Sequence, residues 1–327
     1  MCVQEKLYKV LPYPKHMKSL DELKTIKRNA ESQLLNIPGV TGVGIGYKEV
    51  GGQKTDEISI RVYVDKKREN VPENEQIPPE INGTKTDVIE GEATAVPHSM
   101  DLQTYNPLRG GIAIGKSVGN GEVEVGTLGA IVRENPTNKI GFLSSYHVLV
   151  VGPTHKENDP ISQPAGNPAN IVAHLSADAR LTGTIDAAVA IVDNPSNTLC
   201  KIEGIDGSVA GVADVEELFM QKRTHVRKRG ITTGVTHGEI IDFAAPITMN
   251  YGHGISDGWK LTDQLLIQSD ASSPSFSAAG DSGSAIVDDS GKIVGLLVGG
   301  PPNNIALTYA NNIQNVLGAF DISICTS

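Results

Sequence analysis

The sequence has few cysteines, few aromatic residues and no long apolar run. It contains three cysteines and one tryptophan among 327 residues, and 4% of its residues are aromatic. Because Cys2, Cys200 and Cys325 are far apart and odd in number, we expect no disulfide framework. No window of about 18 apolar residues occurs, so a membrane-spanning helix is not expected.

Positive charge is also scarce. The chain has 28 Lys and Arg against 38 Asp and Glu, which gives a formal net charge of −10 at pH 7. A nucleic acid or an anionic membrane requires a basic face, so neither is an expected partner. The first seven residues, MCVQEKL, lack the apolar region of a secretory signal, and we therefore expect a cytoplasmic protein. An unusual export route, or a signal missing from this sequence, remains the alternative.

Glycine is abundant, with 35 residues, and it separates short runs rich in valine and isoleucine, which favours a mainly β body. The first hundred residues have a different pattern. Ser19 and Glu22 form a capping box in front of an apolar stripe at helical spacing. Alternating apolar residues over 43–47 and 58–64 then predict a hairpin with one buried face.

We therefore expect two parts. Residues 1–105 contain a small α+β module and a linker, with no pattern of catalytic residues. Residues 106–327 form a β domain, with short strands that include 111–115, 126–132 and 140–145.

Residues 279–287, AGDSGSAIV, place Ser282 between two glycines. A serine on such a tight turn exposes its hydroxyl, and its small neighbours let a substrate carbonyl reach backbone N–H groups. A nucleophile in acyl transfer requires this arrangement, although an ordinary Gly/Asp/Ser turn between strands has the same pattern. The interpretation therefore depends on a base and an acid elsewhere in the chain.

Two residues upstream supply them. His147 follows the apolar run 140–145, and Asp186 is a single acid within the apolar stretch 181–192. A buried carboxylate is costly unless it has a partner, and a buried Asp beside a His fixes the tautomer of the imidazole. The alternatives to a catalytic pair are a structural role for His147 at the end of its strand and a solvent-exposed position for Asp186 at the end of its own.

The order His147, Asp186, Ser282 resembles that of the trypsin/chymotrypsin-like serine peptidases. Each residue lies in its own local motif, and a fourth motif resembles a Gly-x-Thr-Thr-Gly hairpin of bacterial members. The four motifs are SSYHVL at 144–149, IDAAVA at 185–190, GDSGS at 280–284 and GITTG at 230–234. The likeness covers about residues 108–320, and the whole chain is similar to a bacterial and plant branch with an N-terminal extension. It implies a mainly β fold, a chymotrypsin-like double β-barrel preceded by a small α+β domain.

The resemblance also implies a serine endopeptidase that works through an acyl-enzyme. Ser282 would attack the peptide carbonyl, His147 would move the proton, and Asp186 would orient His147. The backbone N–H groups of Gly280 and Ser282 would form the oxyanion hole. The substrate-binding residues would be Phe276, Ser277, Val298 and Gly299. No acid lies at the base of that pocket, so a neutral, small or apolar side chain is expected before the cleaved bond.

Asp281 precedes the predicted nucleophile. In many members of the family this acid pairs with a newly cut N-terminal amine. No short activation peptide is evident here, although the bond between Arg109 and Gly110 is cleavable in principle. We expect an unprocessed enzyme in which Asp281 is paired internally or only when substrate binds.

The remaining histidines show no metal-ligand spacing, so neither a metal nor another cofactor is expected. They are His16, His98, His155, His174, His225, His237 and His253. A basic cluster over 222–229 leaves open a preference for acidic substrates, against the alternative of a solvated strand edge.

Two other functions remain open. The chain could be a catalytically silent protease-fold scaffold or binding module, or it could use the same nucleophile as an esterase or a self-cleaving hydrolase. The expected partner is a protein or peptide substrate. A homo-oligomer, or a regulatory partner bound through the N-terminal module, is a further alternative.

Overall fold

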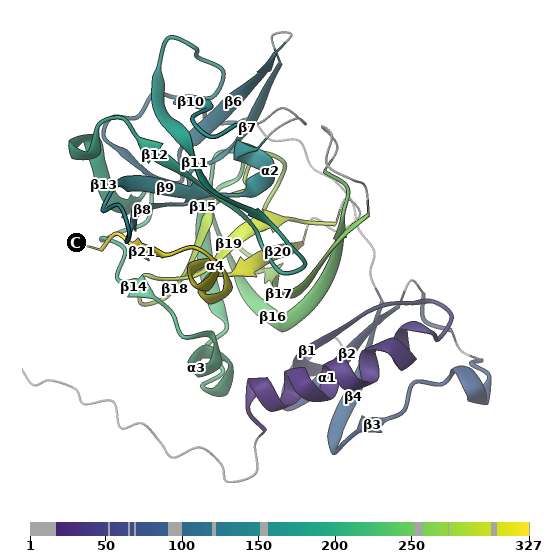
Figure 1. Ribbon diagram of the computed structural model, residues 1–327. Helices are drawn as coiled ribbons and strands as arrows, with labels where there is room; N and C mark the ends of the chain where they lie inside the picture. Colours follow the sequence, from purple (N-terminus) through teal and green to yellow (C-terminus); the bar gives the residue numbers. More distant parts are fainter. Residues whose placement is uncertain are drawn as a thin grey trace, which may run out of the picture.

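The computed structural model describes residues 18–51, 53–64, 66–68, 70–90, 100–119, 122–150, 156–251, 258–273, 275–301 and 306–326. The chain is mainly β, and two large sheets contain most of its strands (Figure 1). No helix in these residues is long and apolar enough to cross a membrane.

The C-terminal part of the chain forms a closed barrel. Its six strands pair in the order β15-β18-β19-β20-β17-β16, and β15 pairs back with β16. They are β15 (His225–Gly230), β16 (Gly234–Met249), β17 (Trp259–Ser269), β18 (Ala285–Asp288), β19 (Lys292–Gly299) and β20 (Leu307–Asn312). The interior is apolar, since Phe243, Leu265 and Val294 belong to one buried cluster. Alternating apolar residues direct one face of each strand into this core.

A second sheet of eight strands forms a half-closed barrel beside the first. The pairing order is β21-β8-β9-β12-β11-β10-β6-β7. The strands are β6 (Ala113–Gly119), β7 (Glu122–Thr127), β8 (Ala130–Glu134), β9 (Ile140–Ser144), β10 (Pro160–Ser162), β11 (Ile171–Leu181), β12 (Asp186–Val192) and β21 (Ile322–Ile324). The predicted double β-barrel is therefore confirmed.

One predicted strand is divided in the structure. The run 126–132 is shared between β7 and β8, with a break at Leu128 and Gly129. Gly129 lies so close to the turn that carries Ser282 that an added Cβ would be 2.5 Å from the carbonyl oxygen of Gly283. The strand is therefore interrupted at the point where the chain meets this turn.

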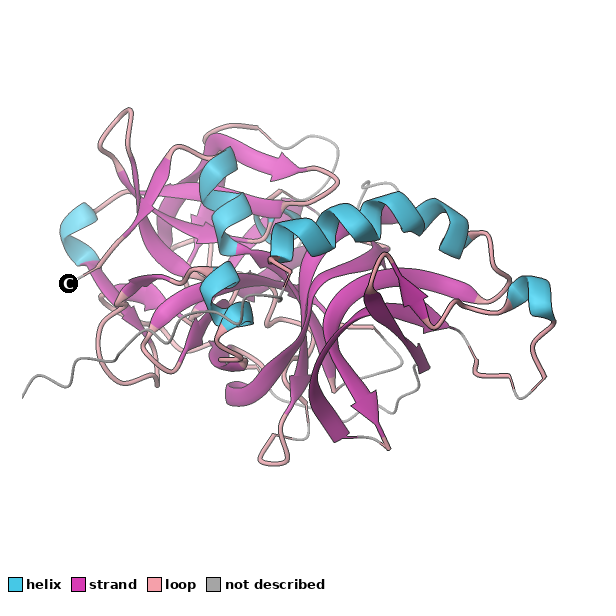
Figure 2. Ribbon diagram, turned by 90° about the horizontal axis from the view of Figure 1, so that it is seen from below, coloured by secondary structure: helices cyan, strands magenta, loops and turns pink. Residues whose placement is uncertain are grey.

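The N-terminal residues form a helix packed on a small sheet, as the pattern predicts. The helix α1 (Leu20–Leu35) starts at a complete capping box between Ser19 and Glu22. It crosses one face of its sheet, which Figure 2 shows from below. The strands are β1 (Val40–Val50), β2 (Gln53–Val64), β3 (Glu80–Ile81) and β4 (Thr84–Glu90), and the short helix η1 (Glu73–Glu75) precedes β3.

This sheet continues into the closed barrel, because β1 pairs with β16 at Gly46 and Asp242. The buried Asp242 carboxylate accepts hydrogen bonds from the Ile45 N–H (2.9 Å) and the Tyr63 hydroxyl (2.6 Å). Gly44 permits the approach, since a Cβ there would lie 1.8 Å from an Asp242 carboxylate oxygen. The division at residues 105 and 106 stays a prediction, and a shared strand pair joins the two parts.

The expectation of no disulfide is wrong, because Cys200 and Cys325 are joined. β21 pairs with β8, which packs against β13 (Thr198–Ile202), so the end of the chain returns to Cys200. The third cysteine, Cys2, lies outside the described residues. Counting cysteines failed because the two that pair are 125 residues apart in the sequence.

Short elements complete the fold. Two of them are strands: β5 (Leu108–Gly110) pairs with β13, and β14 (Gly211–Val212) pairs with β19. The others are the helices α2 (Tyr146–Leu149), α3 (Val215–Met220), α4 (Ile313–Ala319) and η2 (Pro195–Asn197).

Candidate active site

His147 and Asp186 lie in direct contact in the half-closed barrel. His147 is in α2, which follows β9, and Asp186 opens the neighbouring strand β12. The ring Nδ1 donates to Asp186 Oδ2 (2.6 Å), and the His147 backbone N–H donates to Oδ1 (3.2 Å). Asp186 is 0% exposed. Burial lowers the pKa of His147, but the Asp186 charge and hydrogen bond raise it more, so the pKa lies above its ordinary value.

Ser282 lies on a turn between the two barrels. Its backbone carbonyl accepts from the Thr127 N–H at the end of β7 (2.9 Å). The next residue, Gly283, has a φ of +88°, and a Cβ there would lie 3.1 Å from the backbone nitrogen of Ser145, just before α2. The turn is thus held against the segment that leads to His147. In this structure the Ser282 hydroxyl donates to the Val298 carbonyl (3.0 Å).

Two backbone N–H groups of this turn are free to bind a ligand. Among the described residues, neither the Gly280 N–H nor the Ser282 N–H donates a hydrogen bond, whereas Asp281 N, between them, donates to Ala278 O (3.0 Å). Gly280 has a φ of +97°, a conformation that favours glycine. Two unpaired donors on one turn can together stabilise negative charge on an oxygen atom.

The buried carboxylate of Asp281 is paired internally, which is one of the two arrangements expected from the sequence. It accepts from the Thr233 hydroxyl (2.6 Å) and the Thr232 N–H (2.8 Å), and Lys228 Nζ lies 3.3 Å away. Both Lys228 and Asp281 have fully buried side chains. Burial lowers the pKa of Lys228 to about 8, although Asp281 opposes that shift. Lys228 therefore supplies the positive charge that holds the residue before Ser282.

Sequence reasoning did not find Tyr251, which lies two residues beyond the end of β16. Its hydroxyl donates to Asp186 Oδ2 (2.8 Å), and its ring centroid is 5.0 Å from that of His147. Burial and the Asp186 charge raise the pKa of Tyr251, so the hydroxyl stays protonated and donating. Asn311 was also missed, and it holds the Asp186 backbone through two hydrogen bonds of 2.9 and 2.8 Å. Neither residue belongs to a local motif, so no sequence pattern identifies them.

The predicted substrate-binding residues differ in exposure, and one of them, Val298, contacts Ser282. The Phe276 ring is fully buried in the core of the closed barrel, and Ser277 Oγ is hydrogen-bonded to Thr308 Oγ1 (2.6 Å). Val298 is buried and offers its carbonyl to Ser282, whereas Gly299 is partly exposed. Their role as a pocket stays a prediction.

The basic cluster over 222–229 is mostly ion-paired. Lys222 lies 2.6 Å from Asp56, Arg223 lies 3.4 Å from Glu217, and Arg229 is paired with Asp101. Arg229 and Lys228 are buried. The cluster is therefore neither a solvated strand edge throughout nor a free basic patch for acidic substrates.

No family model and no curated protein matches the sequence. Solved structures do match it in fold. Protease A of Thermobifida fusca is 18% identical with a TM-score of 0.47, and the match covers 67% of this chain and 98% of that one. A chymotrypsin of Cellulomonas bogoriensis is 20% identical with a TM-score of 0.47, over 67% and 98%. A Nocardiopsis protease is 17% identical with a TM-score of 0.45, over 66% and 97%.

Proposed function

We propose that the chain is a serine endopeptidase that cleaves peptide bonds with His147, Asp186 and Ser282. The observation that carries the proposal is the 2.6 Å hydrogen bond between His147 Nδ1 and the fully buried Asp186. This bond fixes the tautomer that leaves Nε2 free to accept a proton, and the Asp186 charge stabilises the imidazolium that results.

Each step then has a group to perform it. His147 Nε2 removes the proton of the Ser282 hydroxyl as Ser282 Oγ attacks the substrate carbonyl. The negative oxygen that forms is held by the free N–H groups of Gly280 and Ser282. His147 then protonates the leaving amine, and water attacks the acyl-enzyme with the same residue as base. The Ser282 hydroxyl must first exchange its bond to Val298 for one to His147, a rearrangement that accompanies substrate binding in many enzymes.

The substrate class proposed is a protein or peptide with a neutral, small or apolar residue before the cleaved bond. A cytoplasmic location stays a prediction from the sequence. The Cys200–Cys325 disulfide weighs against it, because disulfides are stable mainly in oxidising compartments. A homo-oligomer or a regulatory partner bound through the N-terminal residues also stays a prediction.

Covalent labelling of the whole protein with a fluorophosphonate tests the proposal. We expect one label per chain, mapped to Ser282, and no label in Ser282→Ala. The chain provides a matched control, because Asp-Ser-Gly occurs a second time at 289–291. Ser290→Ala removes that second serine and should label like the unaltered protein. A label on Ser290, or none on any serine, would contradict the assignment.

Peptide-library cleavage then separates a peptidase from an esterase. We expect Asp186→Asn to lower the cleavage rate on the order of ten-thousand-fold, since the imidazole loses its tautomer control. Labelling without cleavage of any peptide, together with hydrolysis of small esters, would favour the esterase.

A further inference from the structure

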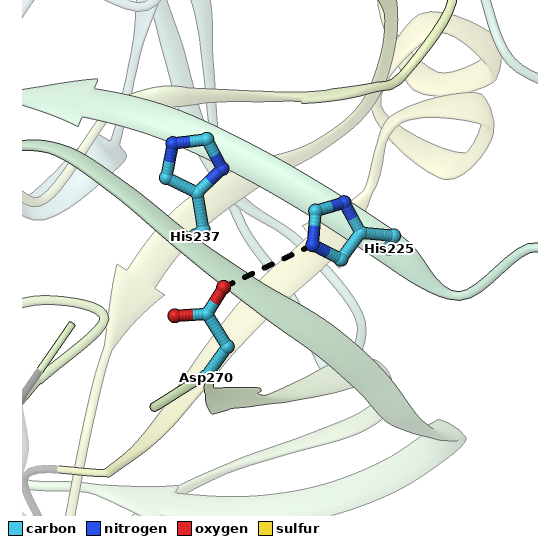
Figure 3. A group of neighbouring side chains, drawn as sticks. All are labelled: His225, His237 and Asp270. Carbon is cyan, nitrogen blue, oxygen red and sulfur yellow. Dashed lines mark ion pairs between the residues drawn. The ribbon is translucent and has the colours of Figure 1, made fainter. Parts of the chain in front are cut away.

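We propose that His225, His237 and Asp270 form a binding site for Zn²⁺ on the closed barrel. The three side chains gather at one point of the surface, and the dashed line in Figure 3 marks the ion pair between His225 and Asp270. One ligand atom from each residue lies within 4.8 Å of the others. The proposal is independent of the proposed protease activity.

The β register explains how the histidines meet. β15 and β16 pair antiparallel, with His225 opposite Glu239 and Arg227 opposite His237. The two histidines are therefore diagonal neighbours on one face of the sheet, close enough for side chains to meet. Asp270 follows β17, and its backbone N–H donates to the His237 carbonyl (3.1 Å). Three adjacent parts of the barrel thus each supply one ligand.

Neighbouring groups orient two of the three ligands. His225 Nδ1 is bonded to Asp289 Oδ1 (3.1 Å), which leaves Nε2 facing Asp270 Oδ2 at 3.9 Å. Asp270 Oδ1 accepts from the Ser272 hydroxyl (2.6 Å) and the Ser272 N–H (2.9 Å), so Oδ2 is the oxygen that turns toward the histidines. A carboxylate behind a histidine, as Asp289 is here, is the usual support of a metal-ligating imidazole.

The donor set selects the class of cation. Two imidazole nitrogens and one carboxylate oxygen suit Zn²⁺, whereas Mg²⁺ and Ca²⁺ prefer oxygen ligands alone. Tetrahedral Zn²⁺ with bonds of about 2.0–2.1 Å holds its ligand atoms roughly 3.3 Å apart. The ligand atoms now lie within 4.8 Å of one another, and the side chains of His225 and Asp270 are 46% and 28% exposed, which leaves them freer to rotate toward a bound ion than buried side chains would be. Three protein ligands leave the fourth position to water.

The charges nearby favour a cation. The two carboxylates of Asp270 and Asp289 outweigh the guanidinium of Arg227, and Glu239 is already paired with Lys54. Bound Zn²⁺ would cross-link β15, β16 and the turn after β17. The site would therefore stabilise the folded barrel, since a ligand that binds only the folded state raises the melting temperature.

Isothermal titration of the metal-stripped protein with Zn²⁺ alone tests the proposal. We expect one Zn²⁺ per chain. Loss of a ligand in His237→Ala or His225→Gln should weaken the affinity for Zn²⁺ at least about ten-fold. Loss of the supporting carboxylate in Asp289→Asn should weaken it about ten-fold. The melting temperature should rise on the order of 5 °C at saturating Zn²⁺ and should not rise with Mg²⁺. His237→Gln serves where His237→Ala fails to fold.

His174 provides the matched control. It is 40% exposed and forms an ion pair with Asp193 at 2.8 Å, but it belongs to no group of three potential metal ligands among the described residues. His174→Ala should bind Zn²⁺ like the unaltered protein. No binding at about 1 mM Zn²⁺, or equal binding by the His225 and His237 variants, would overturn the proposal.

Discussion

The buried ion pair of Lys228 and Asp281 allows a sharp test of how the Ser282 turn is held. Lys228→Met removes the charge and leaves the Asp281 carboxylate without its cation in a site where both side chains are fully buried. Breaking a buried pair by removing one partner costs about 3–5 kcal/mol. Four further donors remain for Asp281, namely the N–H groups of Thr232, Thr233 and Ala278 and the Thr233 hydroxyl, so we expect the lower end, about 3 kcal/mol.

Urea denaturation measures this loss. Trp259, the single tryptophan, lies in β17 of the same barrel and reports its unfolding by fluorescence. A loss of about 3 kcal/mol lowers the folding equilibrium constant roughly 150-fold. Lys85→Met is the control, because Lys85 pairs with Glu80 on the surface with both side chains 48% exposed, and it should cost at most about 1 kcal/mol.

A double-mutant cycle separates the pair from other effects. Asp281→Asn and Lys228→Met share one interaction, so their combined cost should be smaller than the sum by about 1–3 kcal/mol. If Lys228→Met costs no more than Lys85→Met, or if the two costs simply add, Lys228 does not support the turn.

Three further outcomes follow from the contacts described. Tyr251→Phe removes a hydrogen bond to the charged Asp186 and should lower kcat about ten- to hundred-fold with little change in KM; an unchanged kcat would exclude a positioning role. The Lys228 pKa is about 8, so the positive charge that holds Asp281 is lost as pH rises through that value. We therefore expect kcat/KM to fall near pH 8. Lys228→Arg, whose guanidinium stays charged, should move this decline to higher pH. Cys200→Ser should lower the free energy of unfolding by about 2–4 kcal/mol, and reduction of the unaltered protein should lower it by a similar amount. An unfolding free energy that a reductant leaves unchanged would contradict the disulfide.

Local sequence patterns predicted the elements that depend on local interactions. The capping box of Ser19 and Glu22 involves residues three apart, and α1 begins where it predicts. The alternation around Val43 and Ile60 placed the hairpin, since each strand shows one buried face in its own sequence. His147, Asp186 and Ser282 could be proposed from the sequence because each stands in a recognisable local motif. The structure pairs His147 with Asp186, and the catalytic role of all three stays a prediction.

Contacts between distant segments could not be predicted in this way. Tyr251 meets Asp186 65 residues away, and Cys325 meets Cys200 125 residues away, with no pattern around either contact. His225 and His237 become neighbours only through the pairing of β15 with β16, so their spacing resembles no metal-binding motif. Tertiary packing alone brings these groups together.

The junction between β1 and β16 has a consequence for any shortened form of the protein. Residues before 105 supply the strand that covers β16, and they supply the Ile45 and Tyr63 donors to the buried Asp242. A fragment beginning near residue 105 would leave β16 without its partner β1, and exposed strand edges promote aggregation. It would also leave the buried Asp242 carboxylate with the Ala244 N–H (2.8 Å) but without the Ile45 and Tyr63 donors. The N-terminal hairpin thus extends the sheet that forms the closed barrel, and cutting it away would destabilise the barrel.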